Sequence, residues 1–197
     1  MTDLVGVNAL WYVGRGTGVA AVLLLSAVMV LGILTRAGEP VLGLPRFAIS
    51  TLHRTTSLSA LFFLTIHVCS LYFDPYAQLS VVIVGLGFLA PYRPLWQGLG
   101  TVAMELLVAL VLSSLLRNRL SLRSWRLIHW SAYFCWPCAM LHVIGIGTDH
   151  TSKWMLTIDV LCGTAVLIAT AWRVFSPRFA ASGDAVSPLS ATLRGKG

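Results

Sequence analysis

LHRTTSLSALFFLTIHVCSLY, residues Leu52–Tyr72, has the length and apolarity of a helix that crosses a membrane, and it carries two histidines. A second stretch, LIHWSAYFCWPCAMLHVIGIG, residues Leu127–Gly147, repeats this arrangement. The histidines lie fourteen positions apart in the first stretch and thirteen apart in the second: His53 and His67, then His129 and His142. At a helical rise of about 1.5 Å per residue, each gap is roughly 20 Å. One histidine of each stretch therefore lies toward each face of a hydrocarbon layer about 30 Å thick.

The composition indicates a polytopic membrane protein. Of 197 residues, 57% are hydrophobic and only 11% are charged, whereas about a quarter of a soluble domain is charged. Several apolar runs approach twenty residues, and in lipid such runs are helices because each backbone polar group must be satisfied within the segment. The net charge of +7 does not indicate nucleic-acid binding, because the positive residues lie at the ends of the apolar runs and set their orientation.

Five helices are expected to span the membrane, at about Trp11–Leu34, Phe47–Phe73, Trp96–Leu116, Ser124–Ile146 and Trp154–Val174. The first is interpreted as a retained helix rather than a signal peptide, because it exceeds a signal h-region and no Lys or Arg precedes Arg15. The twelve residues Leu79–Ala90 are too few for a span and favour a re-entrant or interfacial segment. Residues 1–174 then form the membrane domain, and residues 175–197, rich in Ser, Pro, Gly and Ala, a disordered cytoplasmic tail.

The distribution of Arg and Lys predicts the orientation. With the N-terminus outside, the outer side receives three positive residues, Arg15, Arg93 and Lys153. The cytoplasmic side receives eleven: Arg36, Arg46, Arg54, Arg117, Arg119, Arg123, Arg126, Arg173, Arg178, Arg194 and Lys196. This is a clear positive-inside bias, and the C-terminus is then cytoplasmic. The second and fourth helices run in the same direction, so His53 and His129 share the inner level while His67 and His142 share the outer one.

Two levels of paired imidazoles suit haem. Neutral imidazole is a good iron ligand, and a pair can hold one iron from both sides. Covalent attachment would need C-x-x-C-H, but Cys135-Trp-Pro-Cys138 is followed by Ala139. The predicted fold is therefore an all-α membrane bundle of about five helices around two stacked b-type haems. A proton path or another metal remains the alternative use of the four histidines.

In a straight helix His129 and His142 would point to different sides, so both can face the same partner helix only if their helix is bent or locally rewound. Fourteen residues at 100° each fall about 40° short of four turns, so His53 and His67 share a face. Thirteen residues fall about 140° short, so His129 and His142 do not share one in a straight helix. Pro137 lies between them and is expected to kink or re-phase the helix.

Four arginines are candidate partners for haem propionates, since Arg binds carboxylates in a bidentate manner. Arg54, Arg123 and Arg126 lie at the inner level, where plain positive-inside anchoring explains them equally well, and Arg15 lies toward the outer end of the first helix.

For three further features the sequence allows both a purely structural role and a functional one. Cys135 and Cys138 share a helix face, and such a C-x-x-C pair would indicate redox work in a thioredoxin-like soluble domain. Inside a membrane helix the interpretation as small packing residues is favoured. Glu105, deep in the third helix, is either a protonated group bonded within the bundle or part of a proton route. His150, beside Asp149 in an outer loop, is a surface histidine or a contact for a metal substrate.

The chain resembles the ferric reductase-like transmembrane domain, the haem core of ferric reductases and NADPH oxidases. The resemblance rests on His53-Arg54-Thr55-Thr56-Ser57-Leu58, Leu64-Thr65-Ile66-His67-Val68, Trp125-Arg126-Leu127-Ile128-His129-Trp130 and Leu141-His142-Val143. It implies two b-type haems, with His53 and His129 on the inner iron and His67 and His142 on the outer one. Electrons would pass from a cytoplasmic donor to an outer acceptor: ferric iron, oxygen or a redox protein.

The sequence departs from the full-length oxidases after Val174, where no Gly-rich dinucleotide fingerprint follows. In this it resembles shorter bacterial members, which are haem subunits of the plasma membrane, including the membrane subunit of the methionine sulfoxide reductase system. Flavin or quinone then enters only through a partner: a separate cytoplasmic flavin reductase, a quinol, or a redox protein outside the membrane. Two alternatives stay open, a quinone-linked respiratory cytochrome b subunit and a haem-free proton or metal transporter lined by His and Glu.

Overall fold

The computed structural model describes residues 2–36, 43, 45–147 and 151–175. Its elements are α1 (Thr2–Leu34), α2 (Arg46–Tyr72), α3 (Val81–Gly85), η1 (Gly87–Leu89), α4 (Pro94–Leu115), η2 (Arg117–Arg119), α5 (Leu122–Trp130), α6 (Ala132–Ile146) and α7 (Lys153–Phe175). Five segments are long and apolar enough to cross a membrane: Ala9–Leu34, Arg46–Tyr72, Pro94–Leu115, Leu122–Ile146 and Lys153–Phe175. The predicted all-α bundle of five spans is confirmed.

Two predicted features fall largely outside the described residues. His150 lies in the gap at 148–150, and of the tail predicted at 175–197 only its first residue is described. That residue, Phe175, is the last residue of α7.

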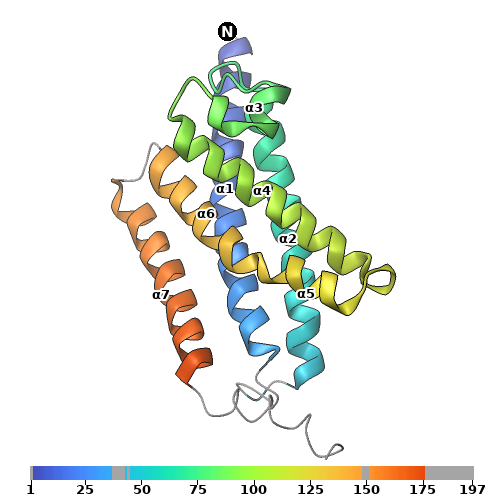
Figure 1. Ribbon diagram of the computed structural model, residues 1–197. Helices are drawn as coiled ribbons and strands as arrows, with labels where there is room; N and C mark the ends of the chain where they lie inside the picture. The colour runs from blue at the N-terminus through green and yellow to red at the C-terminus, as the bar shows by residue number, and fades with distance from the viewer. Residues whose placement is uncertain (1, 37–42, 44, 148–150, 176–197) are drawn as a thin grey trace, which may run out of the picture.

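The helices form a bundle in which α2 and α6 run in the same direction (Figure 1). α1 descends from the N-terminal end and packs along α2, which returns beside it; α4 packs against α6, and α7 covers α1. The parallel course of α2 and α6 brings His67 and His142 toward the end of the bundle that holds the chain's N-terminus. His53 and His129 lie toward the opposite end.

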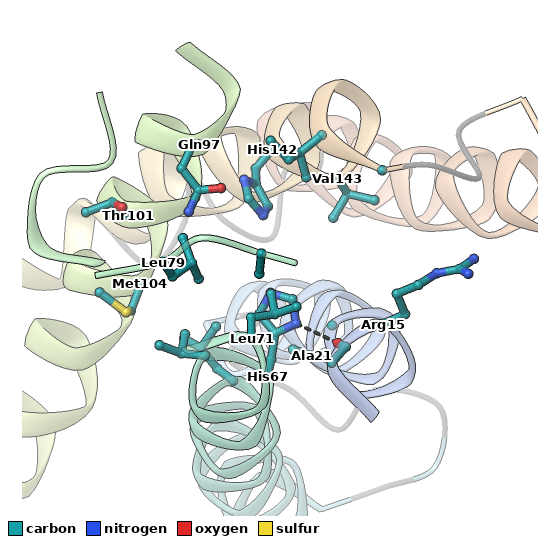
Figure 2. Close-up of a pocket in the computed structure, with 18 of the residues that line it drawn as sticks. Arg15, Ala21, His67, Leu71, Leu79, Gln97, Thr101, Met104, His142 and Val143 are labelled. Carbon is teal, nitrogen blue, oxygen red and sulfur yellow. Dashed lines mark hydrogen bonds between the residues drawn. The ribbon is translucent and has the colours of Figure 1, made fainter. Parts of the chain in front are cut away.

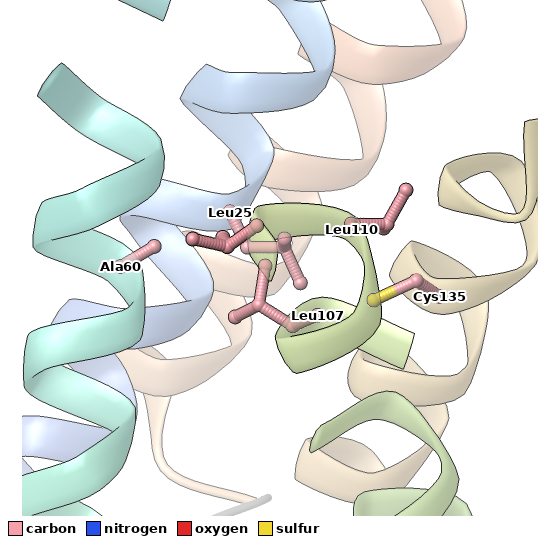
Figure 3. Close-up of a cluster of buried hydrophobic side chains, with 6 residues drawn as sticks. Leu25, Ala60, Leu107, Leu110 and Cys135 are labelled. Atoms are coloured by element: carbon pink, nitrogen blue, oxygen red, sulfur yellow. The ribbon is translucent and has the colours of Figure 1, made fainter. Parts of the chain in front are cut away.

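The centre of the bundle is a cluster of buried apolar side chains contributed by four helices (Figure 3). Its buried members are Leu25, Ala60, Leu107, Leu110, Val111 and Cys135. Ala60, fully buried, lies seven residues from each histidine of α2, so this cluster separates the two histidine levels. A second cluster of Val22, Met140 and Cys162 attaches α7.

The cysteine pair of α6 is buried within this core. Cys135 and Cys138 are free thiols with 1% and 2% of their surface exposed. The Sγ–H of Cys135 donates to the carbonyl oxygen of Ala103 at 3.3 Å. These surroundings are those of packing residues, as the sequence favoured.

The fourth span is interrupted at Ser131, where α5 ends and α6 begins. The Ser131 N–H donates to the Ile128 carbonyl three residues back at 3.0 Å, and its hydroxyl donates to the same oxygen at 2.6 Å. The sequence placed the irregularity at Pro137, but Pro137 lies inside α6. The kink expected at Pro137 stays a prediction, and a second irregularity between His129 and His142 lies at Ser131, where a side-chain bond to the backbone coincides with the break.

The apolar stretch Leu79–Ala90 does not span. It contains only the five-residue α3 and the single turn η1, near the N-terminal end of α1. This segment, which we name the α3–η1 cap, packs on the first turns of α4. The Thr101 hydroxyl donates to the Val84 carbonyl at 3.3 Å, and the ring of Phe88 lies directly over Gly98.

Gly98→Ala should destabilise the fold by loosening this cap. A Cβ at Gly98 would fall well within 3 Å of three ring atoms of Phe88, so the whole ring must move. Overpacking of this kind costs about 1–3 kcal/mol, and the apparent melting temperature in detergent should fall. The control is Gly163→Ala, where a Cβ meets nothing within 4 Å and helix propensity favours alanine. Equal melting temperatures for the two variants would contradict the packing described.

Candidate haem-binding site

The inner pair of histidines has the separation of two ligands on one metal ion. The ring centroids of His53 (α2) and His129 (α5) are 6.3 Å apart, with an interplanar angle of 70°. A metal–nitrogen bond of about 2.0–2.1 Å, with about 1.2 Å from nitrogen to ring centre, places two opposed imidazole ligands about 6.4 Å apart. The 6.3 Å separation matches that of two imidazole ligands of one ion, and it also lies within the range of an edge-to-face ring pair.

The outer pair faces one cavity of about 560 Å³ between α1, α2, α4 and α6. Figure 2 shows His67 and His142 projecting into it from opposite sides, with Leu79, Thr101 and Met104 along its wall. Its volume lies within the range of about 300–1,000 Å³ typical of cofactor pockets, and its mostly apolar lining is also typical.

Three of the four histidines are held in one tautomer by backbone carbonyls. Nδ1 contacts the carbonyl oxygen of Val28 in His53 (3.1 Å), of Gly14 in His67 (2.6 Å, Figure 2) and of Trp96 in His142 (2.8 Å). Because a carbonyl oxygen only accepts, each Nδ1 must carry the proton. Nε2 then keeps its lone pair, which is the form that ligates a metal, and the hydrogen bond fixes the orientation of the ring.

The same three rings lie against glycines of neighbouring helices. A Cβ at Gly18 would be 2.8 Å from Nδ1 of His67, and a Cβ at Gly32 would be 3.2 Å from Cε1 of His53. A Cβ at Gly100 would be 2.8 Å from Cγ of His142 and nearer still to two other ring atoms. Sequence reasoning missed these glycines; their only signal is a glycine inside an apolar span, which often marks a close approach.

The fourth histidine is held by aromatic stacking. The ring of His129 stacks on Trp125 at 4.8 Å and 20°, and the guanidinium of Arg117 lies 4.6 Å from the centre of the same indole. His129 Nδ1 and Trp125 Nε1 are both buried without a hydrogen-bond partner among the described residues. Two orphaned nitrogens beside a metal-spaced histidine pair fit a bound group that brings its own acceptors, as the propionates of haem would.

Comparison with known proteins identifies the family of the chain. A family model described as "Ferric reductase like transmembrane component" matches residues 17–140, well over half of the 197-residue chain. The chain belongs to this family. The matched region contains His53, His67 and His129, and His142 follows it by two residues. Comparison with curated proteins and with solved structures finds no match.

Membership in the ferric reductase-like family confirms the predicted resemblance and gives the chain a membrane redox role. Family members typically bind haem. The donor set of this chain fits that group, since four imidazoles stand in two pairs and three of them are locked in the ligating tautomer.

The four arginines predicted to bind propionates lie at the surface of the bundle or at the outer cavity. Arg54, Arg123 and Arg126 are exposed, and their role toward propionates stays a prediction. The positive charges that act on His129 include those of Arg36 and Arg117, which the sequence suggested only as topology determinants. Arg15 lines the outer cavity, with its guanidinium 4.1 Å from the centre of the Trp11 ring.

Two acidic residues lie within the described membrane spans, one exposed and one partly buried. Glu105 is exposed on α4, so its interpretation as a group bonded within the bundle is wrong: its side chain points out of the bundle. Asp159 of α7, which sequence reasoning passed over, has a buried Oδ1 without a partner in the described part of the chain. An acidic residue within an apolar span was the available signal for it.

Proposed function

We propose that the chain is a transmembrane b-type cytochrome that passes electrons from a cytoplasmic donor to an acceptor on the outer side. His53 and His129 would hold the inner haem, and His67 and His142 the outer one. The observation that carries the proposal is the 6.3 Å separation of the inner imidazoles, supported by the matching tautomers of the other ligands. Haem bound by two histidines supplies one-electron redox chemistry without covalent attachment.

The residues around the histidines have two roles: some orient the imidazole rings, and others form the apolar layer between the two histidine levels. Backbone carbonyls of Gly14, Val28 and Trp96 orient three rings, and Trp125 supports the fourth. The central cluster around Ala60 keeps water from the space between the levels. Since the levels are fourteen residues apart on α2, they lie roughly 20 Å apart along the helix, and together they cover most of the hydrocarbon layer.

Family membership and the charge distribution support the direction of transfer. The positive-inside bias supports a cytoplasmic position for the His53–His129 level, and we propose a bacterial plasma membrane as its location. The donor there would be a separate flavin reductase or a quinol. Ferric iron, oxygen or an extracytoplasmic redox protein would be reduced at the His67–His142 level.

Proteoliposomes test transfer across the membrane. Purified holoprotein is placed in vesicles that contain trapped ferricyanide, and an impermeant reductant is added outside. The ferricyanide absorbance should fall, because electrons can cross the membrane through the two haems held by the histidine pairs. His67→Ala should reduce the bleaching rate to that of empty vesicles. This variant removes a ligand of the outer haem, and without that haem the path between the two faces is interrupted. Wild-type vesicles that bleach no faster than empty ones would refute the proposed function.

A further inference from the structure

Arg93 has a backbone conformation that arginine seldom adopts. Its φ of 43° and ψ of 60° are left-handed, and it lies immediately before Pro94, the first residue of α4. Only glycine takes this conformation without a steric cost, and another residue stays in it where the surrounding structure holds it there. Arginine at this position therefore contributes through its side chain what glycine cannot supply.

The side chain of Arg93 reaches from the start of α4 to the end of α6. Its guanidinium donates a hydrogen bond to the carbonyl oxygen of Gly145, and it lies 5.5 Å from the centre of the Tyr92 ring. Gly145 belongs to the last turn of α6, where carbonyl groups lack N–H partners within the helix. The helix dipole also favours a positive charge at this end. Arg93 therefore caps α6 with its side chain while its own backbone begins α4.

Two further contacts join the same two helix ends, and both involve Trp96. The indole ring of Trp96 lies against Gly145, where an added Cβ would fall well within 3 Å of three ring atoms. The Trp96 carbonyl accepts the Nδ1–H of His142 at 2.8 Å. His142 is three residues before Gly145, so both belong to one turn of α6. We name Arg93, Trp96 and Gly145 the outer clasp.

Arg93 acts on the outer cavity from a distance. The described residues that line this cavity include its neighbour Tyr92, the residue Ile146 after Gly145, and His142, but not Arg93. The guanidinium is engaged with the end of α6 rather than placed to meet a carboxylate of a bound group. An effect of Arg93 on the outer site must therefore pass through the position of His142.

We propose that Arg93 is a positioning residue for the outer haem: by joining the end of α6 to the start of α4, it holds the His142 imidazole in the orientation that ligates iron. This inference rests on the proposed function, since it requires haem at the His67–His142 level. The hydrogen bond from Nδ1 to the Trp96 carbonyl makes the imidazole a stronger donor to a metal. Opening the outer clasp should weaken that bond, and a weaker donor stabilises ferric iron less than before.

Arg93→Gly tests the side chain separately from the backbone. Glycine relieves the left-handed conformation, which offsets the lost hydrogen bond, so the melting temperature and the inner haem should stay close to those of the wild type. Affinity for the outer haem, measured by titrating the apoprotein, should fall about tenfold. The midpoint potential of the outer haem should rise, and this component is identified by its loss in His142→Ala. Arg93→Lys keeps a charged donor and should lose less affinity.

Two controls isolate the outer clasp. Lys153→Gln removes a positive charge at the start of α7, close in sequence to the end of α6, and should leave both haem affinities unchanged. Gln78→Gly relieves the other left-handed backbone found among the described non-glycine residues, with a φ of 49°. It should raise the melting temperature and so gives the effect of strain relief alone.

The outcomes separate this proposal from the function proposed above. Wild-type affinity and potential of the outer haem in Arg93→Gly would overturn the role of Arg93. Equal losses at both haems would also overturn it, because they indicate a general loosening of the bundle, as would the same loss in Lys153→Gln, because the effect would then be one of charge. In each case a wild-type protein with two haems leaves the proposed function standing, whereas a wild-type protein that binds no haem would refute both.

Discussion

His142→Ala should leave the purified protein with one haem per chain instead of two. His142 faces the outer cavity together with His67, and loss of either ligand exposes one side of the same iron. The inner pair, 6.3 Å apart, is separated from this cavity by the central cluster and should keep its haem. A pyridine haemochrome assay against protein concentration measures the change.

Double variants test the pairing itself. His67→Ala with His142→Ala removes two ligands of one site, so the combined variant should still hold one haem. His67→Ala with His129→Ala removes one ligand from each site and should leave none. If the first combination lost both haems while the second retained one, the ligands would be paired across the levels, and the assignment of His67 and His142 to one iron would be wrong.

Gly100→Ala should weaken outer haem binding about 10- to 100-fold, the usual cost of disturbing a residue that orients a metal ligand. A Cβ at this position would lie 2.8 Å from Cγ of His142 and closer to two further atoms of its ring. The imidazole is rigid, so the whole ring must turn, and its Nδ1 would lose the Trp96 carbonyl now at 2.8 Å. Haem titration of the apoprotein would show one weakened site.

Gly16→Ala is the matched control, because a Cβ there meets nothing within 4 Å. Replacing a helix glycine by alanine stabilises by about 1 kcal/mol where space allows, so this variant should bind two haems as tightly as the wild type. Retention of both haems at wild-type affinity in Gly100→Ala would show that His142 does not ligate from the position described.

The sequence was sufficient for the spans and for the matching levels of the histidines. Hydrocarbon thickness fixes the length of an apolar helix, and alternation of direction makes the second and fourth spans parallel. Spacing along a chain therefore becomes depth in the membrane. This is why His53 and His129 could be paired before their 6.3 Å separation was known.

Contacts between helices were not available from the sequence. Periodicity reports which residues share a face but not which helix covers that face. The packing of Gly100 against His142 and the outward direction of Glu105 depend on how neighbouring helices cross. The break at Ser131 coincides with a local side-chain bond, and the sequence carries no signal for that bond comparable to Pro137.

The haem-to-protein ratio of the purified chain, recorded with its absorption spectrum, decides whether the four histidines are ligands at all. Two non-covalent haems per chain, with a low-spin spectrum typical of two axial histidines, are the expected result. A colourless protein without a Soret band would contradict haem ligation by these histidines. The alternative, a haem-free proton or metal transporter, would then be favoured.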